Sequence, residues 1–98
     1  MIVIDKNYIL KFLINQRQYL KRKYGVENIS LYGSFARGEE SEESDIDFIV
    51  EMPPSFHDIC ALEEYLEKVF HRKIDIIRKH SNLRKRFVEE IQKDTISV

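Results

Sequence analysis

Residues Gly33 to Asp47 read GSFARGEESEESDID, a Gly-Ser pair followed by ten residues and then by two aspartates one residue apart. The aspartates open the segment Asp45 to Val50, DIDFIV, in which acids alternate with bulky apolar residues before the sequence becomes wholly apolar. This alternation predicts a half-buried strand, because successive side chains of a strand point to opposite faces. Asp45 and Asp47 would then share one face, and the apolar residues would pack into a core.

Two carboxylates placed side by side repel each other unless a cation lies between them. Carboxylate oxygens are ligands that suit Mg²⁺, and two metal ions about 3.5 to 4 Å apart can hold both the attacking and the leaving oxygen of a phosphoryl displacement. An Asp-x-Asp pair taken alone is equally typical of a solvated strand edge. The metal interpretation therefore depends on the residues before the pair.

Gly33 and Ser34 follow the β-prone run Ile29 to Tyr32 and precede residues that can begin a helical turn. At such a junction free backbone N–H groups attract phosphate, glycine permits close approach, and the Ser34 hydroxyl adds a donor. Arg37 can add a charged donor to the same anion. A tight turn with a serine cap is the alternative reading of Gly-Ser alone.

Taken together, these residues resemble the signature of the DNA polymerase β-like nucleotidyltransferase superfamily, specifically of the minimal nucleotidyltransferases. The resemblance spans roughly residues 25 to 90, and the fuller pattern GSxxRGxxxxxSDxD is matched by Gly33, Ser34, Arg37, Gly38, Ser44, Asp45 and Asp47. It implies that Gly33 and Ser34, with Arg37 and Ser44, bind ATP. It also implies that Asp45 and Asp47 bind Mg²⁺, with two ions at the site.

The family has a third carboxylate on a later strand, and Asp75 is the candidate. It lies in the β-branched run Lys73 to Ile77, where its neighbours Ile74 and Ile76 would face one side and Asp75 the other. By resemblance, Asp75 helps to bind the catalytic metal and accepts the proton of the attacking hydroxyl. A lone acid on a solvent-facing strand is the alternative.

Other chemistries fit less well. Ser34 lacks the flanking glycines of a serine-hydrolase elbow, and the chain has neither a Walker Gly-Lys-Ser/Thr sequence nor a calcium loop after Asp45. The three histidines show no zinc spacing, and Cys60, the single cysteine, is expected to be a buried free thiol.

Composition predicts one small domain over residues 1–98: 43% of the residues are hydrophobic, 34% are charged, and the net charge is −1. We see no signal peptide and no apolar run near the roughly 20 residues that a membrane span needs, which predicts a soluble cytoplasmic protein. The acidic residues 39–43 are expected to form a solvated, mobile loop. Basic residues near positions 21–23 and 78–86 are expected to lie on solvent-exposed faces of helices, which argues against nucleic acid as the main partner.

The expected elements begin with a helix capped by Asp5 and continue with the strand before Gly33, the motif loop and the strand from Asp45. A helix capped by Ser55, the Asp75 strand and a helix capped by Ser81 follow, with residues 96–98 as a tail or edge strand. Apolar core positions are expected on the first helix at Ile9, Phe12, Leu13, Tyr19 and Leu20, on the second at Ile59, Leu62, Leu66 and Val69, and on the last at Leu83, Phe87, Val88 and Ile91. The fold class is α/β (α+β), and the family implies a mixed sheet covered by helices on one side.

The sequence ends about one helix after Asp75, with no region that would hold an acceptor, so we expect a second polypeptide to supply that surface. Minimal nucleotidyltransferases are often paired with a helical HEPN ribonuclease toxin, and the resemblance implies an antitoxin that transfers AMP from ATP to a tyrosine of that toxin. The HEPN motif, an arginine followed after a short spacer by His-x-Tyr, does not occur in this chain. Two alternatives stay open: a subunit that modifies a small molecule such as an aminoglycoside, and a non-catalytic module that inhibits its partner by binding.

Overall fold

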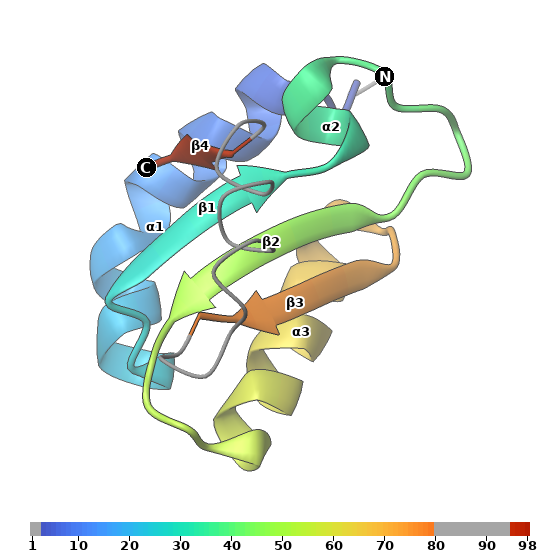
Figure 1. Cartoon of the computed structure of the whole chain (residues 1–98). Coiled ribbons are helices and arrows are strands. Elements are labelled where there is room, and N and C mark those ends of the chain that lie inside the picture. Colours follow the sequence, from blue (N-terminus) through green and yellow to red (C-terminus); the bar gives the residue numbers. More distant parts are fainter. Residues whose placement is uncertain (1–2, 80–94) are drawn as a thin grey trace.

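The computed structural model describes residues 3–79 and 95–98. In it, the alternating segment around Asp47 forms a central strand of the sheet (Figure 1). The elements, in chain order, are α1 (Lys6–Tyr24), β1 (Asn28–Tyr32), α2 (Ser34–Arg37), β2 (Ile46–Glu51), α3 (Phe56–Phe70), β3 (Ile74–Arg78) and β4 (Ile96–Ser97). The helix predicted after Ser81 lies outside the described residues.

The strands form one sheet in the order β3-β2-β1-β4. β2 is antiparallel to β1 and parallel to β3, and β4 is antiparallel to β1. The parallel pair requires a crossover connection, which α3 supplies. The predicted mixed sheet is confirmed, and the last residues form the short edge strand that was one of two expectations for them.

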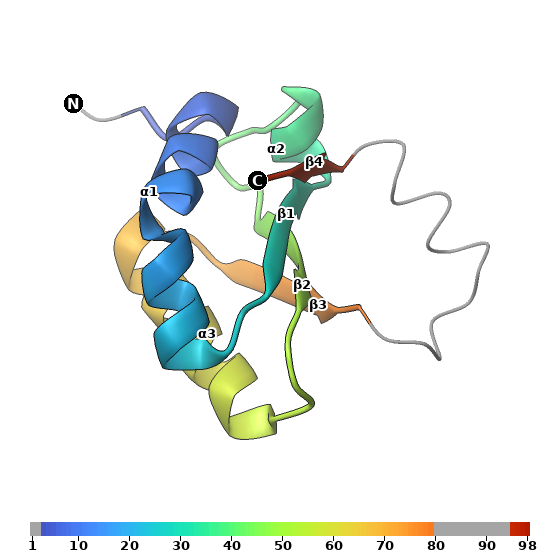
Figure 2. The ribbon, with the colours of Figure 1, turned by 90° about the vertical axis from the view of Figure 1, so that its left-hand side faces the viewer.

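α1 and α3 lie on the same side of the sheet (Figure 2), and the core is between these helices and the sheet. Phe48 of β2, Leu13 of α1 and Leu66 of α3 are fully buried. The ring of Phe70 lies 5.2 Å from the ring of Phe12 and 6.4 Å from that of Phe48, measured between centroids, so it joins both helices to the sheet. Burial of this apolar surface is the main force that holds the layers together.

The helix caps are those that the sequence predicts. The Asp5 side chain accepts a hydrogen bond of 2.9 Å from the Tyr8 amide at the start of α1. At the start of α3, Ser55 Oγ accepts one of 3.2 Å from the Asp58 amide. These bonds satisfy amides that have no partner within the helix.

Two side chains differ from their predicted placement. Cys60 is exposed, although we expected a buried thiol, because it lies two residues before Leu62 and a helix turns about 100° per residue. It therefore points nearly opposite to the buried face of α3. Tyr19 is 38% exposed and packs at the margin of the core, where its ring lies 5.6 Å from that of Tyr65. Among the described residues, no helix is both long and apolar enough to span a membrane.

Candidate active site

The alternation in β2 sorts its side chains as predicted. Ile46, Phe48 and Val50 are fully buried against the helices. Asp47 lies on the opposite face of the strand, and Asp45 immediately precedes β2; both are partly buried. The core thus fixes the strand, and with it the face on which the carboxylates lie.

Asp75 is brought beside Asp47 by the parallel pairing of β2 with β3. The register places Asp47 opposite Asp75 and Ile46 opposite Ile74. Ile74 is buried while Asp75 is exposed on the other face, as the sequence predicts. Since neighbouring strands are roughly 4.8 Å apart, the two carboxylates are side by side although they are far apart in the sequence.

The three acids interact electrostatically. The pKa of Asp47 is raised above its usual 3.8, first by burial and then by the charges of Asp75 and Asp45, while the Arg37 charge acts in the opposite direction. A concentration of negative charge in a partly buried place favours either a proton or a cation. Binding of a cation here would relieve the repulsion among the three carboxylates.

Gly33 is required at the end of β1 for two reasons. Its backbone has φ +78°, a conformation that L side chains rarely adopt. A Cβ placed on it would also collide with Oδ2 of Asp47 and would lie 3.2 Å from Cγ of that residue. The turn that leads into α2 is therefore packed directly against the Asp47 carboxylate.

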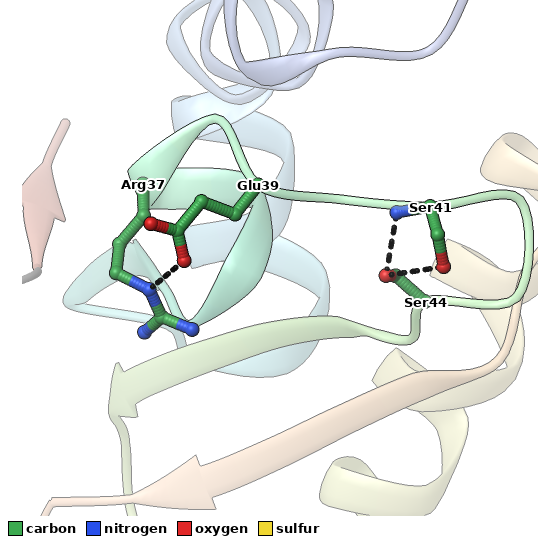
Figure 3. A network of polar contacts seen from close by, with 4 residues as sticks. All are labelled: Arg37, Glu39, Ser41 and Ser44. Atoms are coloured by element: carbon green, nitrogen blue, oxygen red, sulfur yellow. Dashed lines mark hydrogen bonds and ion pairs between the residues drawn. The ribbon is translucent and has the colours of Figure 1, made fainter.

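The other predicted nucleotide-binding residues lie around this turn. Ser34 begins α2 and is partly exposed. Arg37 is in the last turn of α2, where its Nε lies 3.0 Å from Oε2 of Glu39 (Figure 3). The Ser44 hydroxyl accepts a hydrogen bond of 2.8 Å from the Ser41 amide, within the loop before Asp45. Ser44 thus organises the loop that leads to the aspartates.

Tyr32 is a site residue that the motif did not indicate. It is the register partner of Asp47 across the antiparallel β1–β2 pair. Burial, together with the charges of Asp47 and Asp75, raises the pKa of its phenol to about 12, so the hydroxyl stays protonated at neutral pH. The period of two residues in β1 could have placed it on this face, because its neighbour Leu31 is a core residue.

Arg72, between α3 and β3, is a second residue that sequence reasoning missed. Its Nη1 donates hydrogen bonds of 3.1 Å to the backbone carbonyls of Ser41, Glu42 and Ser44. No local sequence pattern predicts such contacts, because they join segments about 30 residues apart. They also show that the acidic loop, expected to be mobile, is tied to the body of the domain.

The carboxylates fit a divalent metal in chemistry, since they supply only hard oxygen donors that repel one another. Within residues 3–79 and 95–98, no three His, Cys, Asp or Glu side chains converge closely enough to form a ready-made metal cage. Such a cage is not required for Mg²⁺, which usually binds through one or two carboxylates plus phosphate oxygens.

A groove of about 590 Å³ lies elsewhere, between α1 and the start of β1. Its lining includes Arg17, Lys21 and Asn28, and Glu27 is the one acid in that lining. Asn28 is paired with Glu51, at the end of β2 that is farther from Asp47. The groove is therefore separate from the carboxylates and lacks the ligands that a metal would need.

Comparison with known proteins places this site in a family: residues 13–98 match the nucleotidyltransferase domain. The chain belongs to the nucleotidyltransferase domain family. A Methanocaldococcus jannaschii protein described as a candidate protein adenylyltransferase is 44% identical over 94 residues, which cover 92% of this chain and 94% of that relative. Protein adenylyltransferase MntA of Thermococcus cleftensis is 34% identical over 83 residues, which cover 83% of this chain and 84% of that protein.

Solved structures agree on the nucleotidyltransferase fold. A candidate minimal nucleotidyltransferase superposes with a TM-score of 0.79 at 25% identity, over 97% of each chain. A toxin–antitoxin structure determined with AMP-PNP superposes with a TM-score of 0.67 at 20% identity, over 96% of this chain and 72% of that chain. This similarity concerns the fold alone. The family and fold class predicted from the motif are confirmed.

Proposed function

We propose that this chain is a Mg²⁺-dependent protein adenylyltransferase that transfers AMP from ATP to a tyrosine of a helical HEPN ribonuclease toxin, and so acts as its cytoplasmic antitoxin. The observation that carries the proposal is the register of Asp47 with Asp75 beside the Gly33 turn, with Asp45 just ahead of β2. The relatives named as protein adenylyltransferases support AMP as the group that is transferred and a protein as its acceptor.

The reaction is an in-line displacement at the α-phosphorus of ATP. The acceptor hydroxyl oxygen forms a bond to phosphorus, the bond to the bridging oxygen of pyrophosphate breaks, and the hydroxyl proton passes to Asp75. The Gly33 backbone and the Ser34 hydroxyl hold the triphosphate, and Arg37 contributes positive charge. Asp45, Asp47 and Asp75 would hold Mg²⁺, which when bound would neutralise negative charge on the phosphates.

Addition of AMP to a tyrosine explains how an enzyme of this kind would neutralise a ribonuclease. The modification adds bulk and negative charge. Next to a ribonuclease active site, that charge repels the RNA phosphates which must bind there. Inhibition would then persist after the antitoxin dissociates, unlike inhibition by binding alone.

The proposal is tested by the intact mass of the protein that co-purifies with this chain from its native host. We compare the wild type with an Asp45→Asn/Asp47→Asn double variant and with Asp58→Asn, a control carboxylate on α3. Partner mass raised by whole adenylate units with the wild type and the control, and not with the double variant, is the expected result. An unmodified partner bound equally by all three forms would replace this proposal with inhibition by binding.

A further inference from the structure

Arg72 connects the two halves of the motif. Its Nη1 donates to three backbone carbonyls of the acidic loop, those of Ser41, Glu42 and Ser44, each at 3.1 Å. Its guanidinium carbon lies 5.2 Å from the ring centroid of Phe35, which is the residue after Ser34 and is fully buried. One side chain thus contacts both the phosphate-binding turn and the loop that leads to the metal-binding aspartates.

The loop needs such a connection. Residues 39–44 carry four glutamates, of which Glu39, Glu42 and Glu43 are exposed, and they contribute no side chain to the core cluster. The start of the loop is attached to α2, because the Glu39 amide donates a bond of 2.9 Å to the Ser34 carbonyl, whereas the bond from the Ser41 amide to Ser44 Oγ lies within the loop. The Arg72 contacts attach it on one side of Asp45, and the Ile46 amide attaches the other side by donating a bond of 3.0 Å to the Lys73 carbonyl.

Arginine suits this position better than lysine. Its planar guanidinium can lie over an aromatic ring while its N–H groups donate to carbonyl oxygens, and it is charged at all relevant pH values.

We propose that Arg72 is a positioning residue of the active site, which holds residues 41–44 on Phe35 so that Asp45 enters β2 where it can share a cation with Asp47. The proposal rests on the nucleotidyl transfer proposed above. Arg72 acts on the reaction through the backbone of Asp45, and it is not assigned any contact with substrate.

The variant that tests this is Arg72→Met, which keeps an unbranched side chain over Phe35 and removes all the donors. Arg78→Met is the matched control, because Arg78 also donates to a backbone carbonyl, that of Met52 at 2.9 Å, farther along β3 from Asp75. Arg72→Lys retains the charge without the planar group. Thermal unfolding of each variant reports whether the fold is kept.

The first readout is independent of activity. Hydrogen exchange of the Ser41, Ser44 and Ile46 amides should accelerate about tenfold or more in Arg72→Met and remain unchanged in Arg78→Met. Binding of Mg²⁺, measured by calorimetry in the presence of AMP-PNP, should weaken about 10- to 100-fold in Arg72→Met only, as is typical when a group that orients metal ligands is removed. Arg72→Lys should give exchange rates and a Mg²⁺ affinity between those of the wild type and of Arg72→Met. It serves as the test variant if Arg72→Met does not fold.

The second readout is the Mg²⁺ dependence of transfer, whose half-maximal concentration should rise in parallel with the weakened binding. Unchanged exchange and unchanged Mg²⁺ affinity in a folded Arg72→Met protein would overturn the role of Arg72. If the wild type transfers no nucleotide, the proposed function fails, while exchange and Mg²⁺ binding still decide the role of Arg72 independently.

Discussion

The ionised side chain of Asp47 is in an unfavourable electrostatic environment, and the fold keeps it there because β2 is fixed by the core. Burial and the charges of Asp75 and Asp45 raise its pKa above 3.8, so the folded state binds its proton more tightly than the unfolded chain does. This contribution to stability is fully present below the unfolded pKa and is lost as the pH rises through the folded pKa. At neutral pH the ionised carboxylate is thus a cost to folding that its proposed function explains.

Asp47→Asn should abolish transfer and, without divalent cation, raise the melting temperature at pH 7 by a few degrees, because it removes that charge. The gain should shrink as the pH is lowered through the raised folded pKa and should vanish below 3.8, the ordinary pKa of the group, where the wild-type carboxylate is neutral in both the folded and the unfolded state. Calorimetric melting at both pH values measures it. A variant that melts well below the wild type at pH 7 would show that Asp47 has a structural role instead.

Gly33 and Gly38 differ both in backbone conformation and in what a Cβ would meet: Gly38 has ψ +23°, in the left-handed helical region, whereas Gly33 has ψ −154°, in a region that is essentially restricted to glycine. Both have positive φ, +78° and +72°, but a Cβ would meet Asp47 at Gly33 and no atom within 4 Å at Gly38. Gly38→Ala should lower the free energy of unfolding by about 1 kcal/mol through backbone strain alone, and the variant should retain transfer. Gly33→Ala should cost at least about 1 kcal/mol more and lose transfer, as measured by urea unfolding and an adenylation assay. Equal costs would contradict the packing described at the turn.

At the scale of the element, α3 has two ends with different tasks. Its N-terminus, capped by Ser55, follows the end of β2 that is remote from Asp47, whereas its C-terminus leads through Arg72 into the strand that carries Asp75. α3 also packs against the sheet through Leu62, Leu66 and Phe70, which are fully buried. The helix therefore acts on the site through its C-terminal connection.

Ser55→Ala removes the acceptor for the Asp58 amide and should destabilise the domain by about 1 kcal/mol. Transfer measured well below the melting temperature should equal that of the wild type, because the cap is at the remote end of the helix. Chemical unfolding and a transfer assay on the same preparation make the comparison. A loss of activity without a loss of stability would show that the N-terminal end of α3 also positions the site.

At the scale of the whole molecule, the carboxylates should make folding responsive to ligand. Mg²⁺ with AMP-PNP at about 100 times its dissociation constant should stabilise the native state by about 2.7 kcal/mol, since it binds the folded site only. The Asp45→Asn/Asp47→Asn variant should show little of this shift in thermal unfolding, and omission of Mg²⁺ should abolish it for the wild type. An equal shift in the variant would place the nucleotide at another site.

Local patterns in the sequence were sufficient to predict β2, the caps at Asp5 and Ser55, and the face shared by Asp45 and Asp47. The pattern from Gly33 to Asp47 also identified the family. Such features depend on spacing over a few residues, which strand and helix geometry convert directly into a face or a cap. Cys60 was wrongly predicted to be buried because it lies near Ile59 and Leu62 in the sequence. A rotation of about 100° per residue places it on nearly the opposite side of the helix from Leu62.

Only the tertiary structure placed Asp75 opposite Asp47, gave Tyr32 its two acidic neighbours, and brought Arg72 to the loop before Asp45. Strand order and register are set by how the core packs, and a shift of one residue would turn Asp75 to the other face. The chain's periodicity shows which face each side chain occupies, but contacts between segments about 30 residues apart arise only when the helices and the sheet bury a common core.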